Sequence, residues 1–314
     1  MPERRAYEDS RVFMNTLVKI RVTSDLGTVR TRQKISEAYN QFGNVVKRYT
    51  RFDKSSDLAR LNQNPEQHFE VSDELFELVK LMLDLANLSG GAYDPTIIDL
   101  LEAYGYDSRN NFENLNSVNL LHEIRQLMKT RPSFKDIVLN EKAHTIRLQK
   151  KQRLDLGSIG KGYAIDLAYD VLAEFPGFII NAGGDIRAKG EKSNGSPWRV
   201  GILELSRPNR NPHPPKAIGA IELDGQSLAA SGGWSRRVKF FHHLLSTRTG
   251  LPINETSQSY VLAKNATLAD VWATILFTMG DAGIELINSQ QDIEGTIFYS
   301  NGKISTSRGF SYLG

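Results

Sequence analysis

The stretch Asp155-Leu-Gly-Ser-Ile-Gly-Lys-Gly162 places three glycines within six residues. Alternation from Thr145 to Asp155 predicts a strand before it, and apolar residues at helical spacing from Tyr163 to Phe175 predict a helix after it. A strand, a glycine-rich turn and a helix in this order can present backbone N–H groups to a phosphate, with Lys161 as a point charge. The spacing fits neither a Walker A loop nor G-x-G-x-x-G, and a tight structural turn is an equally good interpretation.

On both sides of this stretch the chain mixes strands, hairpins and helices without a regular βαβ order, which favours an α+β fold over a doubly wound sheet. The stretch Arg207–Lys216 is rich in Pro and Asn and predicts a flexible loop over about residues 205–217. The expected strands are Phe13–Val22, Gly177–Asn181, Trp198–Leu205 and a hairpin of Thr296–Ser300 with Gly302–Ser307, and the other expected helices are Thr31–Phe52, Ser72–Leu88 and Thr267–Met279.

Length and composition exclude several classes of protein. The chain has 314 residues, which is just above the length at which single cores tend to split, so we expect one domain over residues 1–314 with two lobes. The absence of cysteine excludes disulfides, thiolate nucleophiles and Cys-based metal sites. A net charge of +3 gives no indication of a nucleic-acid partner, and no G-x-S-x-G elbow indicates a serine hydrolase.

A second glycine turn follows a predicted strand at Asn181-Ala-Gly-Gly-Asp-Ile-Arg187. Gly183 and Gly184 would let a ligand or another backbone approach closely, and Asp185 would place a carboxylate at the tip. We therefore include these three residues among the candidate cofactor-binding residues. Taken alone, the stretch is better explained as a hairpin turn.

Asp270 and Thr274 lie four residues apart on the last predicted helix, so their side chains share one face. The helix is otherwise so apolar that it should be largely buried, and a buried carboxylate needs a partner. With a loop carbonyl, these two oxygen donors would suit Mg²⁺. A polar pair that faces solvent is the competing interpretation.

Two further motifs have simple structural explanations. His242 and His243 would point to opposite faces of a strand, so one ring could face a pocket with Arg248 as an anion partner, although a lone surface histidine is the simpler interpretation. The motif Tyr93-Asp-Pro-Thr96 resembles a helix start with Asp94 as N-cap, and capping alone explains it.

Taken together, these stretches resemble the ApbE-like family of flavin transferases, which move FMN from FAD onto proteins. The resemblance covers roughly Phe13 to Gly280, and the stretches occur in the family's order. They are Met14-Asn-Thr16, Ser56–Asn62, Tyr93–Thr96, DLGSIGKGYAID (155–166), NAGGDIRAKG (181–190), SGGWSRR (231–237), HHLLSTRTG (242–250) and ADVWAT (269–274).

The resemblance implies a single two-lobed catalytic unit with mixed or antiparallel sheets, with FAD in the cleft between the lobes and Mg²⁺ beside its pyrophosphate. The implied metal ligands are the Ser158 carbonyl and the side chains of Asp270 and Thr274. The implied FAD contacts are Met14 on the flavin side, Phe52, Ala92, Tyr93, Asp94, Asp155, Lys161 and one of the pair His242 and His243.

The implied activity is Mg²⁺-dependent transfer of FMN from FAD to a Thr or Ser hydroxyl of a partner flavoprotein, with release of AMP. Lys161 and Mg²⁺ would neutralise the pyrophosphate, and Asp155 or His243 would take the hydroxyl proton; the sequence does not separate these two. The alternatives are an FAD pyrophosphatase that gives FMN and AMP, and a protein that binds FAD without reaction.

The chain departs from the family pattern at three points. Ser246-Thr247 stands where Asp-Pro is usual, Phe52 stands where a Tyr is typical, and the usual lipoprotein cysteine is absent. The N-terminus has no apolar segment of signal-peptide length, and no apolar run approaches the 18 residues of a membrane span. We therefore expect a cytoplasmic protein that does not span a membrane, or a periplasmic or anchored one if a leader was removed.

Overall fold

The computed structural model describes residues 4–107, 112, 115, 118–204, 216–233, 238 and 241–313. The chain divides into two compact units. The sheet unit contains Met1–Val46, Ile159–Gly232 and Glu255–Gly314, and the helical unit contains Lys47–Ser158 and Gly233–Asn254. In the described part of the chain, no helix is long and apolar enough to cross a membrane.

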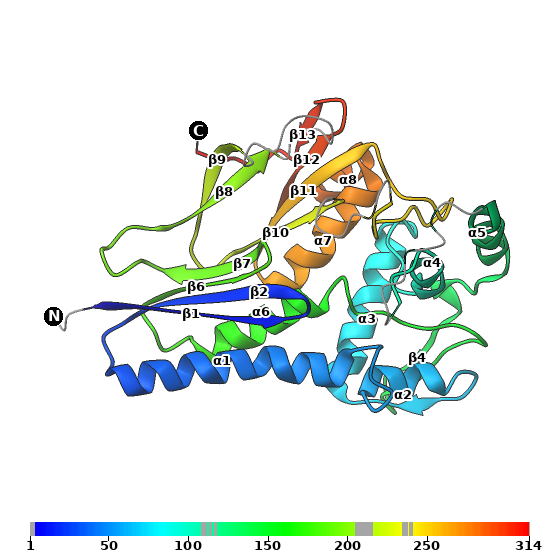
Figure 1. Ribbon diagram of the computed structural model, residues 1–314, viewed down its shortest axis with the longest axis horizontal. Coiled ribbons are helices and arrows are strands. Elements are labelled where there is room, and N and C mark those ends of the chain that lie inside the picture. Colours follow the sequence, from blue (N-terminus) through cyan, green and yellow to red (C-terminus); the bar gives the residue numbers. More distant parts are fainter. Residues whose placement is uncertain are drawn as a thin grey trace. The chain divides into compact units, whose positions relative to one another are not determined.

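The sheet unit is built on eight strands, and each strand pairs antiparallel with its neighbours (Figure 1). A separate ribbon pairs β8 (Trp198–Glu204) with β9 (Lys216–Leu223). The order across the sheet is β1 (Arg5–Phe13), β2 (Thr16–Ser24), β6 (Gly177–Ala182), β7 (Asp185–Gly190), β10 (Ser227–Gly232), β11 (Thr256–Ala263), β12 (Ile293–Tyr299) and β13 (Ile304–Thr306).

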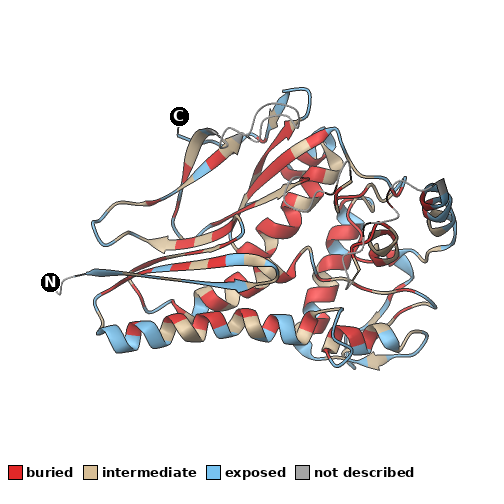
Figure 2. Ribbon diagram, viewed as in Figure 1, coloured by how far each residue is buried: buried red, intermediate tan, exposed pale blue. Residues whose placement is uncertain are grey.

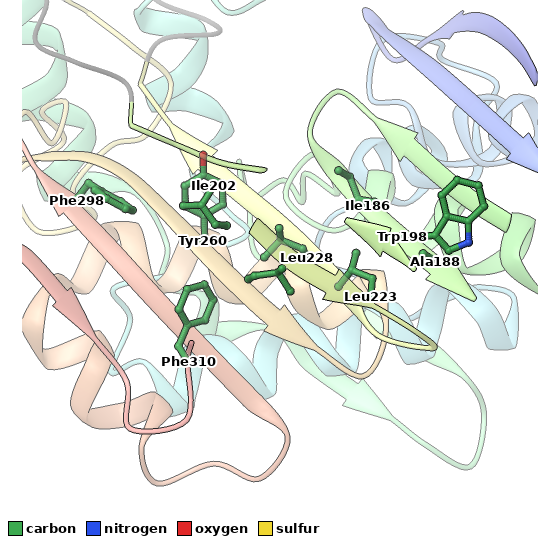
Figure 3. Packing of buried hydrophobic residues seen from close by; sticks show 10 residues of the cluster. Ile186, Ala188, Trp198, Ile202, Leu223, Leu228, Tyr260, Phe298 and Phe310 are labelled. Carbon is green, nitrogen blue, oxygen red and sulfur yellow. The ribbon is translucent and has the colours of Figure 1, made fainter. Parts of the chain in front are cut away.

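The two faces of this sheet are covered differently, because neighbouring strand residues point to opposite faces. On β11, the Ser259 hydroxyl donates to the Ala273 carbonyl of helix α7 (Ala266–Met279), whereas Tyr260 packs with apolar residues of the ribbon. Figure 3 shows this cluster, which includes Trp198, Ile202 and Leu223 from the ribbon. Helix α7 is buried along most of its length (Figure 2), so it forms the core on its side of the sheet.

The other helices of the sheet unit are α6 (Gly160–Val171), which packs on α7, α8 (Asp281–Ile287) and most of α1 (Thr28–Tyr49). The helical unit contains α2 (Asp57–Gln63), α3 (Asp73–Leu88), α4 (Ile98–Ala103), α5 (Val118–Thr130), the 3-10 turn η1 (Phe134–Asp136), and a small sheet of β3 (Phe69–Glu70), β5 (Thr145–Arg147) and β4 (Val138–Asn140).

The structure confirms the α+β class with antiparallel sheets, and several predicted elements are close to the observed ones. Helix α3 begins after the N-cap Ser72, whose hydroxyl accepts from the Leu75 N–H, and α7 ends at Gly280 as predicted. The hairpin around Asn301-Gly302 is also present as β12 and β13. That the whole chain acts as one domain stays a prediction.

Several predicted elements were wrong in extent. The helix predicted for Thr31–Phe52 spans Thr28–Tyr49, so Phe52 lies after it. The strand predicted for Thr145–Asp155 ends at Arg147, because the chain turns at Lys151, whose φ is 64°. The strand predicted from Phe13 begins at Thr16, because Met14 and Asn15 have φ values of 50° and 57° and form the turn between β1 and β2. The helix predicted from Tyr163 begins three residues earlier, at Gly160.

Part of the predictions falls outside the described residues. The residues outside the description include 205–215 of the predicted loop and 234–237 of the SGGWSRR stretch. The last two residues of the predicted loop, Lys216 and Ala217, begin β9 instead.

Candidate active site

One of the glycines after Asp155, Gly162, serves helix packing in the structure. Gly160 and Gly162 lie in the first turn of α6, and a Cβ on Gly162 would come within 2.2 Å of the Ala266 carbonyl oxygen in α7. The Gly162 N–H donates to Oδ2 of Asp270 at 3.0 Å. The prediction of a phosphate-binding turn was therefore wrong for Gly162, because Asp270 already accepts its N–H.

Lys161 lies with two buried carboxylates, and we call Lys161, Asp185 and Asp270 the lysine triad. The Lys161 ammonium forms an ion pair with Asp185 and lies 3.3 Å from Oδ1 of Asp270. The Asp185 and Asp270 side chains are only 2% and 8% exposed, and that of Lys161 is 20% exposed. One ammonium against two carboxylates leaves one negative charge, and an uncompensated buried charge is costly. The triad therefore favours the binding of a further cation that would compensate this charge.

Asp185 reaches the triad from a two-residue hairpin turn between β6 and β7. Gly183 and Gly184 have φ values of 66° and 105°, which glycine adopts without strain. A Cβ on Gly183 would also lie 2.2 Å from Oγ1 of Thr16. The hairpin interpretation is thus confirmed, but Asp185 is not exposed at a tip: it is buried at the start of β7 and accepts from the Ala230 N–H at 3.1 Å.

The oxygen donors next to the triad suit a hard divalent cation. Thr274 follows Asp270 by one helical turn, and its hydroxyl lies 3.3 Å from that of Ser231. Among the residues that the structure describes, no three His, Cys, Asp or Glu side chains cluster as a metal site. One carboxylate with hydroxyl and carbonyl oxygens is a donor set of the kind Mg²⁺ accepts, and the net negative charge of the triad fits such an ion. Ser158 belongs to the helical unit, where its hydroxyl hydrogen-bonds the Tyr93 hydroxyl at 2.9 Å.

In the helical unit, Asp94 orders the segment that follows Ala92 and Tyr93. Its carboxylate accepts from the Thr96 N–H at 2.8 Å and from the Thr96 hydroxyl at 2.6 Å, and it forms a buried ion pair with Arg131. The predicted helix N-cap was wrong, because α4 begins only at Ile98 and Asp94 caps a turn instead. Arg131 lies just after α5, and no local pattern in the sequence points to it.

Asp155 and Phe52 share a neighbour, Arg51, that no sequence pattern indicates. The Arg51 guanidinium lies 3.7 Å from Asp155 and donates to Glu102 at 3.0 Å. It also lies over the Phe52 ring, 4.3 Å from the centroid, while Phe52 as a residue remains 56% exposed. Asp155 accepts in addition from the Gly157 N–H at 3.1 Å. Arg51 thus contacts both candidate residues.

The two adjacent histidines have different environments. His242 is buried; its Nδ1 accepts from the Leu244 N–H at 3.3 Å, which leaves Nε2–H to donate to the Ile253 carbonyl at 3.0 Å. Both ring nitrogens are thus used by the backbone. The His243 ring is half-buried and meets Tyr106 edge-on, with centroids 6.2 Å apart. The two histidines do not lie on a continuous strand, since Phe241 forms only an isolated bridge.

The departure from the family pattern at Ser246-Thr247 has a structural role in the helical unit. The Thr247 hydroxyl donates to the Gly91 carbonyl at 2.6 Å, and proline has no hydroxyl that could do this. The same turn ends at Gly250, whose carbonyl accepts from the Tyr104 hydroxyl at 2.9 Å. Burial raises the pKa of Tyr104 to about 12, so this hydroxyl stays a neutral donor. The turn after His243 is thereby tied to the segment that leads into Tyr93.

Comparisons with known proteins agree with this fold and sequence pattern. The FAD:protein FMN transferase of Klebsiella pneumoniae is 27% identical over 98% of this chain and 93% of its own length. That of Rhodobacter capsulatus is 30% identical over 74% of this chain, which spans only 43% of that relative. The crystal structure of an ApbE protein from Thermotoga maritima superimposes with a TM-score of 0.84 and 28% identity, covering 97% of both chains.

The relatives are transferases, and the chain is an enzyme of that class. It belongs to the ApbE family, whose profile matches residues 14–297. The resemblance noted in the sequence is therefore confirmed at the level of the family.

Proposed function

We propose that this protein transfers FMN from FAD to a Thr or Ser hydroxyl of an acceptor flavoprotein and releases AMP, in a reaction that depends on Mg²⁺. The observation that supports the proposal most strongly is the lysine triad, a buried cluster with a net negative charge beside further oxygen donors. The name shared by the curated relatives supports the choice of FAD and of a protein acceptor.

The proposed roles are those that the family resemblance implies. Asp270, Thr274 and the Ser158 carbonyl would hold Mg²⁺, Lys161 would face the pyrophosphate, and Met14 would contact the flavin. The remaining FAD contacts would be Phe52, Ala92, Tyr93, Asp94, Asp155 and His243.

In the proposed reaction, the acceptor hydroxyl oxygen forms a bond to the phosphorus on the FMN side. The bond from that phosphorus to the bridging oxygen breaks, and AMP leaves with the electron pair. Lys161 stabilises the negative charge that develops on the phosphate oxygens. When bound, Mg²⁺ supplies further neutralisation of the pyrophosphate.

The hydroxyl proton would pass to His243 rather than to Asp155. Imidazole titrates near neutral pH and is the most common general base in enzymes. Asp155 already accepts from Gly157 and faces the Arg51 guanidinium. His242 is excluded from this role because the backbone uses both of its ring nitrogens.

The direct test is incubation with FAD and Mg²⁺, with and without an acceptor peptide that carries a Thr, followed by chromatography for AMP, FMN and labelled peptide. AMP that appears only with the acceptor, together with flavinylated peptide, supports the transferase. AMP and free FMN without the acceptor would identify a pyrophosphatase. FAD that stays intact in both reactions would contradict the proposed activity.

Substitution of the two histidines should separate catalysis from folding. We expect His243→Ala to slow peptide flavinylation by about 10²- to 10⁴-fold, the usual contribution of a general base, with FAD binding retained. We expect His242→Ala to lower the free energy of unfolding by about 1–3 kcal/mol, because a buried N–H and a carbonyl lose their partners. Rate assays and urea unfolding measure the two effects. Equal rate losses in two equally stable variants would contradict the assignment.

The Thr247 hydroxyl should matter for FAD affinity. Thr247→Val keeps the shape of the side chain but removes the bond to Gly91, which is worth about 1 kcal/mol. We expect the KM for FAD to rise about fivefold with little change in kcat, and Thr247→Ser to restore it. Unchanged steady-state kinetics in the valine variant would show that this bond has no role in the site.

A further inference from the structure

The lysine triad has a movable member and a fixed one. Asp185 is 1% exposed at the start of β7, and the Ala230 N–H of β10 holds its carboxylate at 3.1 Å. Lys161 extends from the first turn of α6 on a long side chain that is 20% exposed. The position of the ammonium therefore depends on the carboxylates around it.

Asp270 offers its two oxygens to different partners. Oδ2 accepts from the Gly162 N–H, whereas Oδ1 faces the Lys161 ammonium at 3.3 Å. A divalent ion bound to Oδ1 at the usual Mg–O distance of about 2.0–2.1 Å would lie within a few ångströms of the ammonium. Two positive charges at that separation repel each other strongly in a buried site. Lys161 and the metal therefore compete for one oxygen.

We propose that Asp185 is a positioning residue that decides this competition: it holds the Lys161 ammonium by an ion pair, which limits the contact of Lys161 with Oδ1 of Asp270 to a long bond of 3.3 Å that the metal can displace. This inference rests on the metal site of the proposed function, but it concerns a residue outside the proposed ligand set. Without Asp185, Asp270 would be the only triad carboxylate left to Lys161, and Lys161 would occupy the metal's oxygen. Asp185 thus acts on the metal through Lys161 rather than by contact.

A distinctive consequence is that metal affinity and activity change in opposite directions when Lys161 is removed. Lys161→Gln removes the competing ammonium, so Mg²⁺ should bind more tightly, by about tenfold, the order expected for one lost interaction of this kind. The same change should slow AMP release, because the pyrophosphate loses a positive charge. Asp185→Asn, whose amide oxygen can still accept from Ala230, should weaken Mg²⁺ binding by about tenfold.

The test is calorimetric titration of Mg²⁺ alone into the full chain, without FAD, for the wild type, Asp185→Asn, Lys161→Gln and the double variant. The inference requires that Asp185→Asn weaken binding much less when Lys161 is already replaced, since no competitor remains. Lys303→Met is a matched control, because Lys303 also pairs with an aspartate, Asp281, but on the surface of the same unit. This control should bind Mg²⁺ like the wild type.

Two results would overturn the inference. An equal loss of affinity from Asp185→Asn in both backgrounds would mean that Asp185 acts by its charge alone, and the proposed metal site would still stand. A wild-type protein that takes up no Mg²⁺ would remove the metal site and this inference together. Thermal unfolding of each variant, with and without Mg²⁺, identifies any variant that binds poorly because it is unfolded. An unfolded variant is replaced in the same double-mutant cycle: Lys161→Met takes the place of Lys161→Gln, and Asp185→Ser takes the place of Asp185→Asn.

Discussion

Replacing Asp270 with alanine is expected to abolish Mg²⁺-dependent release of AMP from FAD, with a loss of about 10³-fold in rate, the upper range for removal of one preorganised charge. Asp270 is the only carboxylate among the proposed metal ligands, so its loss removes the main negative charge that holds the ion. Lys161 and Asp185 would remain as a neutral ion pair with no excess charge to attract a cation.

A structural effect accompanies this substitution and needs its own control. The Gly162 N–H loses its acceptor in the alanine variant, which costs about 1–3 kcal/mol of stability. Asp270→Asn keeps an acceptor oxygen for Gly162 but lacks the charge, so it should be inactive yet nearly as stable as the wild type. Both rates are measured over a Mg²⁺ titration. An alanine variant with full Mg²⁺-dependent activity would remove the metal assignment.

The second large effect is expected from Gly162→Ala, which should lower the free energy of unfolding by about 3 kcal/mol, the upper end of the cost of overpacking. The added methyl group would meet the Ala266 carbonyl oxygen at 2.2 Å, so α6 and α7 must move apart. The shift would also displace Lys161, the next residue, from its carboxylates.

Gly160 provides a matched control for this prediction. It lies two residues earlier in the same helix, and a Cβ there meets nothing within 4 Å. Gly160→Ala should therefore be neutral or slightly stabilising, because alanine favours the helix by up to about 1 kcal/mol. Urea unfolding of both variants gives the comparison. Equal stabilities would show that the approach of α6 to α7 does not require a glycine.

The local part of the site was predictable from the sequence, because it depends on periodicity. The pairing of Asp270 with Thr274 follows from their spacing on a helix whose apolar composition already indicated burial. The end of that helix at Gly280 could be predicted because glycine readily adopts the positive φ that commonly ends a helix. The hairpin at Gly183 and Gly184 could be predicted because two adjacent glycines favour positive φ values.

The tertiary partners could not be predicted, because no spacing rule connects them. Lys161 and Asp185 belong to a helix and a hairpin, and only the packing of α6 against the sheet brings them together. Arg51 and Arg131 have no surrounding motif, yet each fixes a candidate carboxylate. Glycine is uncommon within helices, so the glycines of α6 predict a turn, but the close approach of α7 at Ala266 favours glycine at position 162 within the helix.

The pairing of strands that are distant in the sequence also constrains the order in which the sheet can form during synthesis. Strand β2 pairs with β6, where Val18 lies opposite Ala182, so the N-terminal hairpin emerges from the ribosome long before its neighbour in the sheet. At about 5–20 residues per second, the delay is roughly 8–30 s. Throughout this interval, the open side of β2 is an unpaired strand edge. The segment with His243 and Thr247 is made later still, after β10. The nascent chain thus completes its proposed catalytic and metal-binding residues only late in synthesis.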